Sequence, residues 1–245
     1  MKKTGILTIG IALFWVMSTQ AVATDYYFDS DGVKIQFTSD GEGDAVILIH
    51  GYQATGSLNW KMPGIVRMLS NDYRVIVMDV RGHGKSEDAP DDAYGIEAVH
   101  DVIRLMDHVG LQKAHIAGYS MGGMITIKLV TMYPRRVRSA IVGGMGWVSP
   151  GSITLRTENL DDKFVKIFNG FAEYSTTETE MRAIETPLTV IVGTKDEGQL
   201  RRVARWQEIV PSLPVVYVEG ANHIRCVFRP GFKNAVKEFL DAQPK

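Results

Sequence analysis

The sequence has almost no cysteine and almost no excess of charge. Cys226 is the only cysteine, so the chain can form no internal disulfide and its stability must come from its core. We expect Cys226 to be packed or idle, because a catalytic thiol needs its own base and an exposed setting. The 27 Lys and Arg against 28 Asp and Glu give a formal net charge of −1, and the basic residues form no stripe. The sequence therefore lacks the basic patch that is typical of nucleic-acid-binding proteins, and a small-molecule partner is expected instead.

Long hydrophobic runs are also missing. The apolar run from Gly5 to Met17 is too short to span a bilayer comfortably, and it lies between Lys2-Lys3 and the small residues Ala21-Val22-Ala23. This order is typical of a secretory signal peptide, which would comprise residues 1–23. We therefore expect cleavage after Ala23, a periplasmic or secreted mature chain, and no stable membrane partner after cleavage. An uncleaved membrane anchor is the alternative.

The rest of the chain, residues 24–245, alternates short β-rich runs with amphipathic helical stretches. Strands are expected at residues 26–28, 33–37, 45–49, 74–78, 114–117, 140–142, 188–192 and 215–218, the first two as an antiparallel hairpin. Helices are expected around residues 96–109, 121–132, 203–209 and 232–240. No internal repeat or linker divides this segment. The pattern predicts a single α/β domain in which helices cover both faces of a mostly parallel, eight-stranded sheet.

The segment Gly118-Tyr119-Ser120-Met121-Gly122 fits the G-x-S-x-G pattern of a nucleophile elbow. Its two glycines lie where a strand would turn so tightly into a helix that any side chain would collide. The pattern alone is weak, but a strand-like run at residues 113–117 precedes it and a helix-like run at 123–127 follows it. This setting predicts that Ser120 is a nucleophile with its hydroxyl exposed at the edge of the sheet.

A serine hydroxyl needs a base near neutral pH, and the base needs an orienting carboxylate. Asp196 and Glu197 follow the expected strand 188–192, and His223 follows the last expected strand. Ligand sites in such sheets lie outside the carboxyl ends of the strands, where these residues would meet Ser120. We predict His223 as the base and Asp196 as the orienting acid. Glu197 is the alternative carboxylate, and an ordinary loop residue is the alternative for His223.

Two backbone N–H groups are expected to bind the oxyanion of the reaction. One belongs to Met121, at the N-terminus of the helix that follows the elbow. The other belongs to Tyr52, because Gly51 lets the chain turn sharply after the third strand. We interpret His50 as a structural histidine that braces this oxyanion hole. The ring of Tyr52 either lines the pocket or lies on the surface.

Together these landmarks resemble the α/β-hydrolase family. They are His50-Gly51, the loop 79–86 (Asp-Val-Arg-Gly-His-Gly-Lys-Ser), the elbow 118–123, Asp196 and His223, in the order found in that family. The resemblance covers nearly all of residues 26–243 and implies the α/β-hydrolase fold with a Ser-His-Asp triad. It also implies that the loop 79–86, including His83, is structural and not catalytic.

The connection between the sixth and seventh strands departs from many members of the family, which insert a large helical cap there. This chain has only about residues 146–187 for that connection, so we expect a short or minimal cap and a shallow or open pocket. Phe164, Phe168 and Phe171 form a helical apolar stripe within it. The stripe fits either a short lid over the pocket or a helix that packs into the core.

The residues and the resemblance together predict a serine hydrolase that cleaves a small carboxylic ester through an acyl-enzyme. The expected partner is thus a small-molecule acyl substrate. We expect no metal or organic cofactor, since the other histidines lack the spacing of metal ligands. Thioesterases, amidases, lactonases and carbon–carbon bond hydrolases of the same fold are alternatives, as is a ligand-binding protein without turnover. The sequence does not determine the acyl group or the alcohol group of the substrate, or the oligomeric state of the protein.

Overall fold

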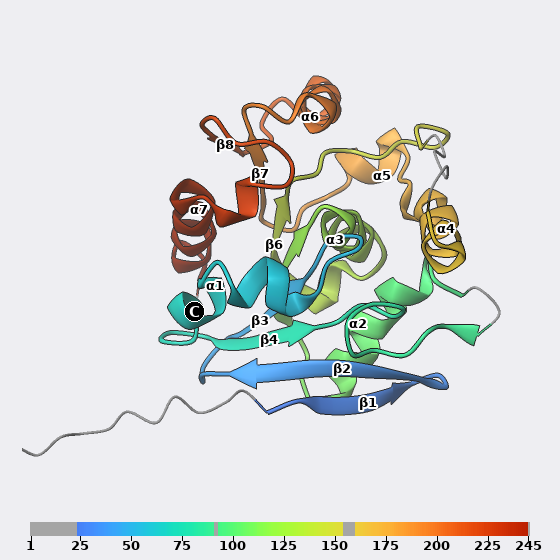
Figure 1. Ribbon diagram of the computed structural model, residues 1–245. Helices are drawn as coiled ribbons and strands as arrows, with labels where there is room; N and C mark the ends of the chain where they lie inside the picture. The colour runs from blue at the N-terminus through green and yellow to red at the C-terminus, as the bar shows by residue number, and fades with distance from the viewer. Residues whose placement is uncertain (1–23, 91–92, 154–159, 245) are drawn as a thin grey trace, which may run out of the picture.

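The computed structural model describes residues 24–90, 93–153 and 160–244 (Figure 1). The expected signal peptide, residues 1–23, lies outside the described residues, as does the segment 154–159 of the expected cap region. Within the described part of the chain, no helix has the length and apolar character that crossing a membrane requires.

An eight-stranded, mostly parallel sheet runs through the molecule, which confirms the predicted fold class. Its strands are β1 (Tyr26–Ser30), β2 (Val33–Asp40), β3 (Ala45–Ile49), β4 (Arg74–Met78), β5 (Ala114–Tyr119), β6 (Val137–Gly143), β7 (Leu188–Gly193) and β8 (Val215–Val218). They lie side by side in the order β1-β2-β4-β3-β5-β6-β7-β8. The pairs β1–β2 and β2–β4 are antiparallel, and all other neighbours in the sheet are parallel. The carboxyl ends of the parallel strands therefore meet at one edge of the sheet.

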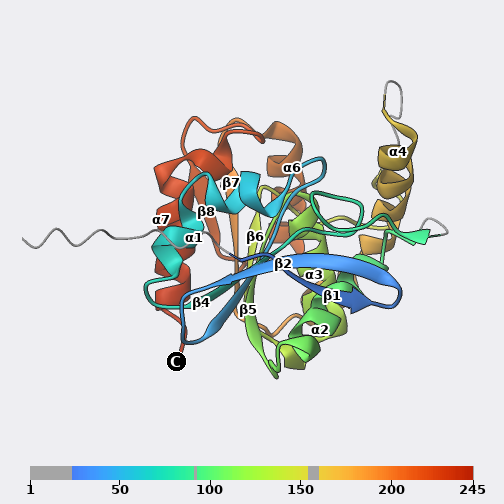
Figure 2. The same ribbon diagram turned by 60° about the horizontal axis from the view of Figure 1, so that its bottom comes forward.

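Helices cover both faces of this sheet. They are η1 (Ser57–Lys61), α1 (Ile65–Leu69), α2 (Glu97–His108), α3 (Met121–Met132), η3 (Pro134–Arg136), α4 (Asp162–Asn169), η4 (Gly170–Tyr174), α5 (Glu178–Arg182), α6 (Glu197–Ile209), η5 (Cys226–Phe228) and α7 (Pro230–Asp241). Figure 2 shows α1 and α7 on one side of the sheet and α2 and α3 on the other. This is the layered arrangement that a buried parallel sheet requires.

The hydrophobic core consists of two halves, one on each face of the sheet. Successive side chains of a strand point to opposite faces, so the wholly buried strand β3 contributes to both halves. Ile47 and Ile49 pack in the half beneath α2, α3 and α6. Val46 and Leu48 pack in the half beneath α1 and α7. This explains why the predicted central strands are continuous apolar runs and not alternating patterns.

The observed elements differ from the predicted ones mainly at their ends. The strands predicted at 45–49, 74–78 and 215–218 have the observed bounds, and the other five are longer than predicted. The short helices η1 and α1 were not expected, because five residues are too few to give a periodic pattern. The apolar stripe of three phenylalanines is divided, since α4 ends at Asn169 and Phe171 lies in η4.

A buried ion pair anchors the loop that follows β4. Arg81 donates hydrogen bonds from Nε and Nη2 to the two carboxylate oxygens of Asp101, at 2.7 and 2.6 Å. Ser30 of β1 donates a third hydrogen bond to Asp101 at 2.5 Å, so the carboxylate is well paired despite full burial. These contacts join the loop, helix α2 and strand β1, and thereby fix the base of the loop beside the carboxyl edge of the sheet.

Candidate active site

Ser120 lies in a strained turn between β5 and α3. Its backbone has φ 55° and ψ −112°, a left-handed φ that is unfavourable for a residue with a side chain. A Cβ at Gly118 would collide with the backbone carbonyl of Gly122, and one at Gly122 would collide with that of Ile49. Only glycine fits at both positions, which explains the G-x-S-x-G pattern and holds the Ser120 hydroxyl at the sheet edge.

The structure brings Ser120, His223 and Asp196 together. Along the chain, Ser120 lies 103 positions from His223, and Asp196 lies 27 positions from His223. Ser120 Oγ lies 2.9 Å from His223 Nε2. His223 Nδ1 lies 2.6 Å from Asp196 Oδ2. Each of the three follows a different parallel strand, β5, β7 or β8. With Nδ1 protonated and donating to the carboxylate, Nε2 is left to accept the proton of the serine hydroxyl.

Asp196 and its neighbour Glu197 point in different directions. The Asp196 side chain is 8% exposed and caps helix α6 by accepting a hydrogen bond from the Gln199 N–H. The Glu197 side chain is 86% exposed and lies near Arg201, one turn further along α6. The structure thus places the Asp196 carboxylate, and not that of Glu197, against the imidazole.

The loops after β7 and β8, which carry Asp196 and His223, approach each other closely. A Cβ at Gly193 would collide with the backbone carbonyl of Ala221. The Lys195 N–H donates a hydrogen bond to the same carbonyl at 2.8 Å. Asp196 directly follows Lys195 and His223 lies two residues after Ala221, so these backbone contacts help to set the separation of the two side chains.

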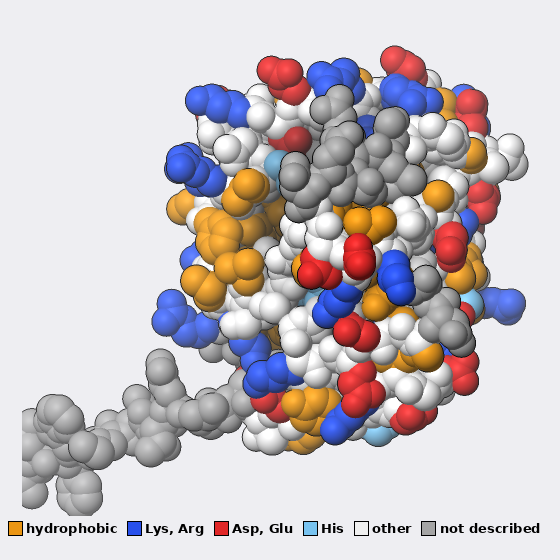
Figure 3. All heavy atoms as spheres, turned by 45° about the vertical axis from the view of Figure 1, so that its right-hand side comes forward, with side chains coloured by type: hydrophobic (Ala, Val, Ile, Leu, Met, Phe, Trp, Pro, Cys, Tyr) orange, Lys and Arg blue, Asp and Glu red, His pale blue; other side chains and the backbone are white. Residues whose placement is uncertain are grey.

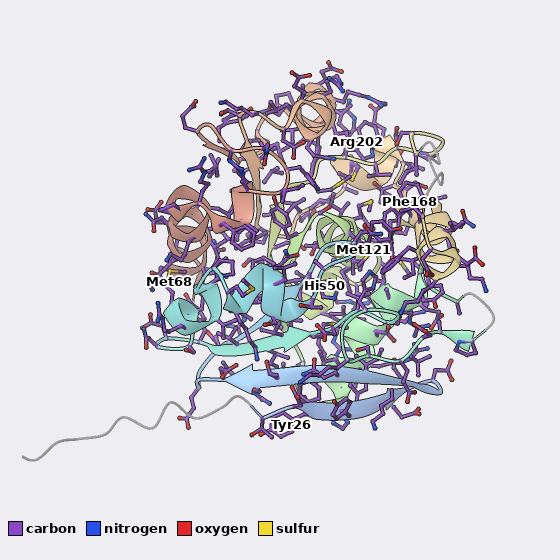
Figure 4. All side chains as sticks on the ribbon, in the orientation of Figure 1. Tyr26, His50, Met68, Met121, Phe168 and Arg202 are labelled. Carbon is purple, nitrogen blue, oxygen red and sulfur yellow. The ribbon has the colours of Figure 1, made fainter. Side chains whose placement is uncertain are left out.

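The two predicted oxyanion donors lie on either side of Ser120. A Cβ at Gly51 would come within 3.2 Å of Ser120 Cβ, so the turn that carries Tyr52 touches the elbow. Figure 4 labels His50 and Met121, which lie close together at the end of β3. Within the described chain, the backbone N–H groups of Tyr52 and Met121 donate no hydrogen bond. Both are therefore available to a bound oxygen atom.

Asn59 and Tyr119 contribute to the site in ways that the sequence did not indicate. The Asn59 side-chain oxygen, on η1, accepts a hydrogen bond from the Gly51 N–H at 2.8 Å and fixes the turn before Tyr52. The buried Tyr119 hydroxyl donates a hydrogen bond to the backbone carbonyl of His223. Tyr119 is the first variable residue of the elbow motif, but no local pattern shows which distant loop its hydroxyl reaches.

A cavity of about 270 Å³ opens beside the serine hydroxyl. Its lining includes Gly51, Tyr52, Ser120, His223, Ile224 and Phe228. Larger cavities, of about 350, 400 and 550 Å³, lie elsewhere among the described residues, but neither Ser120 nor His223 lines any of them. The cavity beside Ser120 is therefore the one in which the arrangement can do chemistry.

The phenylalanine stripe packs on Tyr52 and does not line this cavity. Tyr52 makes edge-to-face ring contacts with Phe164, Phe168 and Phe171, at centroid distances of 5.5, 6.0 and 5.3 Å. Its hydroxyl donates a hydrogen bond to the Phe164 backbone carbonyl at 2.9 Å. Of the two interpretations of the stripe, these contacts favour a packed helix over a lid. They also show that the ring of Tyr52 is held by α4 and η4 at the cavity wall.

Two buried neutral histidines brace the turn that carries Tyr52. His50 Nε2 accepts a hydrogen bond from the Val80 N–H at 2.9 Å, and His50 Nδ1 bonds to the Gly51 carbonyl at 2.7 Å. His83 Nε2 accepts from the Gln53 N–H at 3.3 Å. Burial lowers the pKa of both histidines, that of His83 to about 3 with a further contribution from His50. Both rings therefore act as fixed hydrogen-bonding groups, as expected for structural histidines.

Replacing His83 by glutamine is expected to weaken the dependence of folding stability on pH. The pKa of His83 is about 3 when folded and about 6.5 when unfolded, so the unfolded chain binds the extra proton between these values. Its contribution to stability is complete above pH 6.5 and is lost as pH falls toward 3. Between pH 7 and 5, the variant should lose about 2 kcal/mol less stability than the parent. Urea unfolding at both pH values measures this, and an equal loss in both proteins would contradict it.

Cys226 is wholly buried, in agreement with the packed thiol expected from the sequence. Burial raises the pKa of its thiol to about 12, so the thiol stays protonated at neutral pH. Among the described residues, no cluster of three or more His, Cys, Asp or Glu side chains has the arrangement of a metal site.

Known proteins share this fold and parts of this sequence. Residues 44–214 match the family described as alpha/beta hydrolase fold. The dihydrolipoyllysine-residue acetyltransferase component of the acetoin cleaving system of Cupriavidus necator is 33% identical over 130 residues, 52% of this chain and 34% of that protein. The 2-hydroxy-6-oxo-6-phenylhexa-2,4-dienoate hydrolase of Comamonas testosteroni is 35% identical over 121 residues, 48% of this chain and 42% of that protein. The solved enol-lactonase of Burkholderia xenovorans has a TM-score of 0.71 at 25% identity, covering 88% of this chain and 100% of that one.

The match to the family covers most of the chain, including the elbow and the carboxylate that follows β7. The chain itself matches less than half the length of the two curated relatives, so the similarity to them is a similarity of part of each protein. The eight-stranded sheet, its strand order and the serine at the sheet edge agree with the family match. The chain belongs to the alpha/beta hydrolase family.

Proposed function

We propose that this protein is a serine hydrolase that cleaves a carboxylic ester of a small acyl substrate through a covalent acyl-enzyme. The observation that carries the proposal is the hydrogen-bonded series Ser120 Oγ, His223 Nε2, His223 Nδ1 and Asp196 Oδ2, with separations of 2.9 and 2.6 Å. The series ends in a cavity beside two N–H groups without partners in the described chain. A binding protein without turnover has no need of this combination.

In the proposed reaction, Ser120 Oγ attacks the carbonyl carbon of the ester while its proton moves to His223 Nε2. Asp196 stabilises the imidazolium through the Nδ1 hydrogen bond, and the N–H groups of Tyr52 and Met121 stabilise the oxyanion. His223 then protonates the oxygen of the leaving alcohol. Water attacks the acyl carbon, His223 takes its proton, and collapse of the second intermediate returns that proton to Ser120.

The bond cleaved by relatives bears on this choice. The solved enol-lactonase is named for a lactone, which is a cyclic ester, and it is similar to this chain over 88% of its length. This supports an ester as the substrate. The similarity to the hydrolase of 2-hydroxy-6-oxo-6-phenylhexa-2,4-dienoate, over 48% of this chain, supports a carbon–carbon bond as the second candidate. Both candidate substrates contain a carbonyl group, which the N–H groups of Tyr52 and Met121 could bind.

A substrate panel separates these candidates. The purified protein is assayed on p-nitrophenyl esters of graded acyl length, on a lactone, a thioester and an anilide, and on a vinylogous 1,5-diketone. We expect turnover of the esters and a fluorophosphonate adduct on Ser120 in the intact mass. Turnover of the diketone alone would favour the carbon–carbon hydrolase. No turnover of any of these compounds, together with no adduct, would refute a serine hydrolase.

Replacing Tyr119 by phenylalanine is expected to lower kcat about 2- to 10-fold, because it removes a hydrogen bond of about 0.5–1.5 kcal/mol that holds the His223 backbone. The phenylalanine ring fills the same space, so KM should change little. Steady-state kinetics on the best ester of the panel measure both constants. A change in KM without a change in kcat would show that Tyr119 contacts substrate instead of positioning His223.

A further inference from the structure

Large apolar side chains are exposed at the mouth of the candidate active site. Leu58 of η1 lines the cavity beside Ser120, and the exposed Met62 directly follows η1. Ile224, from the loop after β8, and Phe228, from η5, line the same cavity, and η1 and η5 contact each other. We call these four residues the apolar rim. Figure 3 shows hydrophobic side chains gathered on this side of the molecule, with Lys and Arg side chains around them.

The four side chains of the apolar rim are exposed to solvent. Ile224 is 76% exposed and Met62 is 70% exposed, although each could bury a large apolar area. Leu58, Ile224 and Phe228 also line the cavity beside Ser120, so the rim is continuous with that cavity. Exposed apolar groups of this size around a functional opening mark a surface that another apolar phase covers.

In the two segments that carry the apolar rim, every charged side chain is a lysine or an arginine. Residues 52–68 and 221–236 together contain five basic side chains and no Asp or Glu. The basic residues are Lys61, Arg67, Arg225, Arg229 and Lys233. The chain as a whole is nearly neutral, so these two segments carry an excess of positive charge that the composition conceals, although Asp25, outside them, lies near Lys61. Apolar side chains among basic ones form the surface that binds the interface of an anionic membrane.

The geometry points to a lipid-docking surface: the apolar rim inserts into an anionic lipid interface, and the surrounding basic residues bind its headgroups. A second copy of this chain fits the surface poorly, because a two-fold contact would bring two positive surfaces together. The contact is reversible, since a few side chains bury little area compared with a membrane-spanning helix. If the proposed function holds, docking would open the cavity beside Ser120 directly toward lipid acyl groups.

The test measures binding apart from hydrolysis. The Ser120→Ala protein is sedimented with vesicles of phosphatidylcholine alone and with vesicles of equal parts phosphatidylcholine and phosphatidylglycerol. We expect binding to the anionic vesicles only, weakening as salt is added because salt screens exposed charges. Failure of ester hydrolysis would leave this result unchanged, so the two proposals can fail separately.

Three variants of the Ser120→Ala protein test the two parts of the surface. Met62→Ser and Ile224→Ser should each weaken vesicle binding roughly tenfold, because each removes one inserting apolar side chain. The double variant Arg225→Glu/Arg229→Glu should weaken it at least about 25-fold, at about fivefold for each positive charge removed. The matched control is Met132→Ser/Arg135→Glu, an exposed apolar and a basic residue beside the amino end of β6, which should bind as the parent does.

To check that the variants fold, the same substitutions are made in the protein that keeps Ser120, and its ester hydrolysis is measured. Met62 and Arg225 do not line the cavity, so Met62→Ser and the double arginine variant should keep the parent's turnover of a short water-soluble ester. Absence of parent binding to anionic vesicles, equal binding to neutral ones, or an equal loss in the matched control would overturn the proposal. Sedimentation velocity that shows a dimer dissolved by Met62→Ser would also overturn it and would assign the apolar rim to a second copy.

Discussion

Replacing Ser120 by alanine is expected to lower kcat/KM for the best ester by about 10⁴- to 10⁶-fold. The variant loses the only nucleophile that the elbow aims at the cavity, while the His223 ring and the two N–H donors stay in place. Alanine has the smaller side chain, so it fits wherever serine does, and the global fold should be unaffected. Steady-state kinetics, with a melting curve for each protein, measure the effect.

Ser57 provides the matched control for this substitution. It lies exposed at the start of η1, near the same cavity but outside its lining. Ser57→Ala should keep the parent's kcat/KM and still form the fluorophosphonate adduct, which Ser120→Ala should not. Substantial turnover by Ser120→Ala would rule out the serine mechanism, whatever the structure of the site.

Replacing Asp196 by asparagine is expected to lower kcat by about 10⁴-fold. Asparagine keeps the size of the side chain but loses the charge that stabilises the imidazolium. If its amide faces the ring, it also donates to Nδ1, which places the ring proton on Nε2, where the serine hydroxyl must deliver its own proton. The change therefore acts on the ring of His223 and not on the position of Ser120. Fluorophosphonate labelling should slow by a similar factor, because it uses the same activated hydroxyl.

The adjacent carboxylate supplies a control of the same chemistry. Glu197→Gln removes an exposed charge near Arg201 and leaves the contact between Asp196 and His223 intact. It should change kcat by less than about twofold, as expected for an exposed ion pair far from the reacting atoms. A large loss in Glu197→Gln with a small loss in Asp196→Asn would reverse the assignment of the acid.

Those parts of the fold that depend on local patterns could be predicted from the sequence. Strand β3 is a continuous apolar run because both of its faces are buried, and its predicted bounds are the observed ones. The elbow is partly local, since the collision that requires Gly118 is with Gly122, four residues further along the chain. The collision that requires Gly122 is with Ile49 of the neighbouring strand β3, so only the first of these two constraints acts over a few residues.

Contacts between distant segments could not be predicted in this way. Asp196 and Glu197 are both acidic and adjacent, and only the start of α6 turns one inward and the other outward. Asn59 reaches Gly51 from a five-residue helix that has no periodic signature. The Tyr119 hydroxyl meets the backbone of a loop 104 residues away. These interactions depend on how the loops at the sheet edge are stacked, which no local pattern encodes.

The three residues of the site are attached to parts of the sheet that differ in their resistance to local opening. Ser120 follows β5, a central strand whose six residues are all buried. His223 follows β8, a four-residue strand at the edge of the sheet in which only Val218 is buried. Strands with few buried contacts open at lower free energy than the core. On warming, β8 and the loop that carries His223 should therefore open before β5 and the elbow do. The imidazole would then leave Ser120, and activity should be lost at temperatures below the main melting transition.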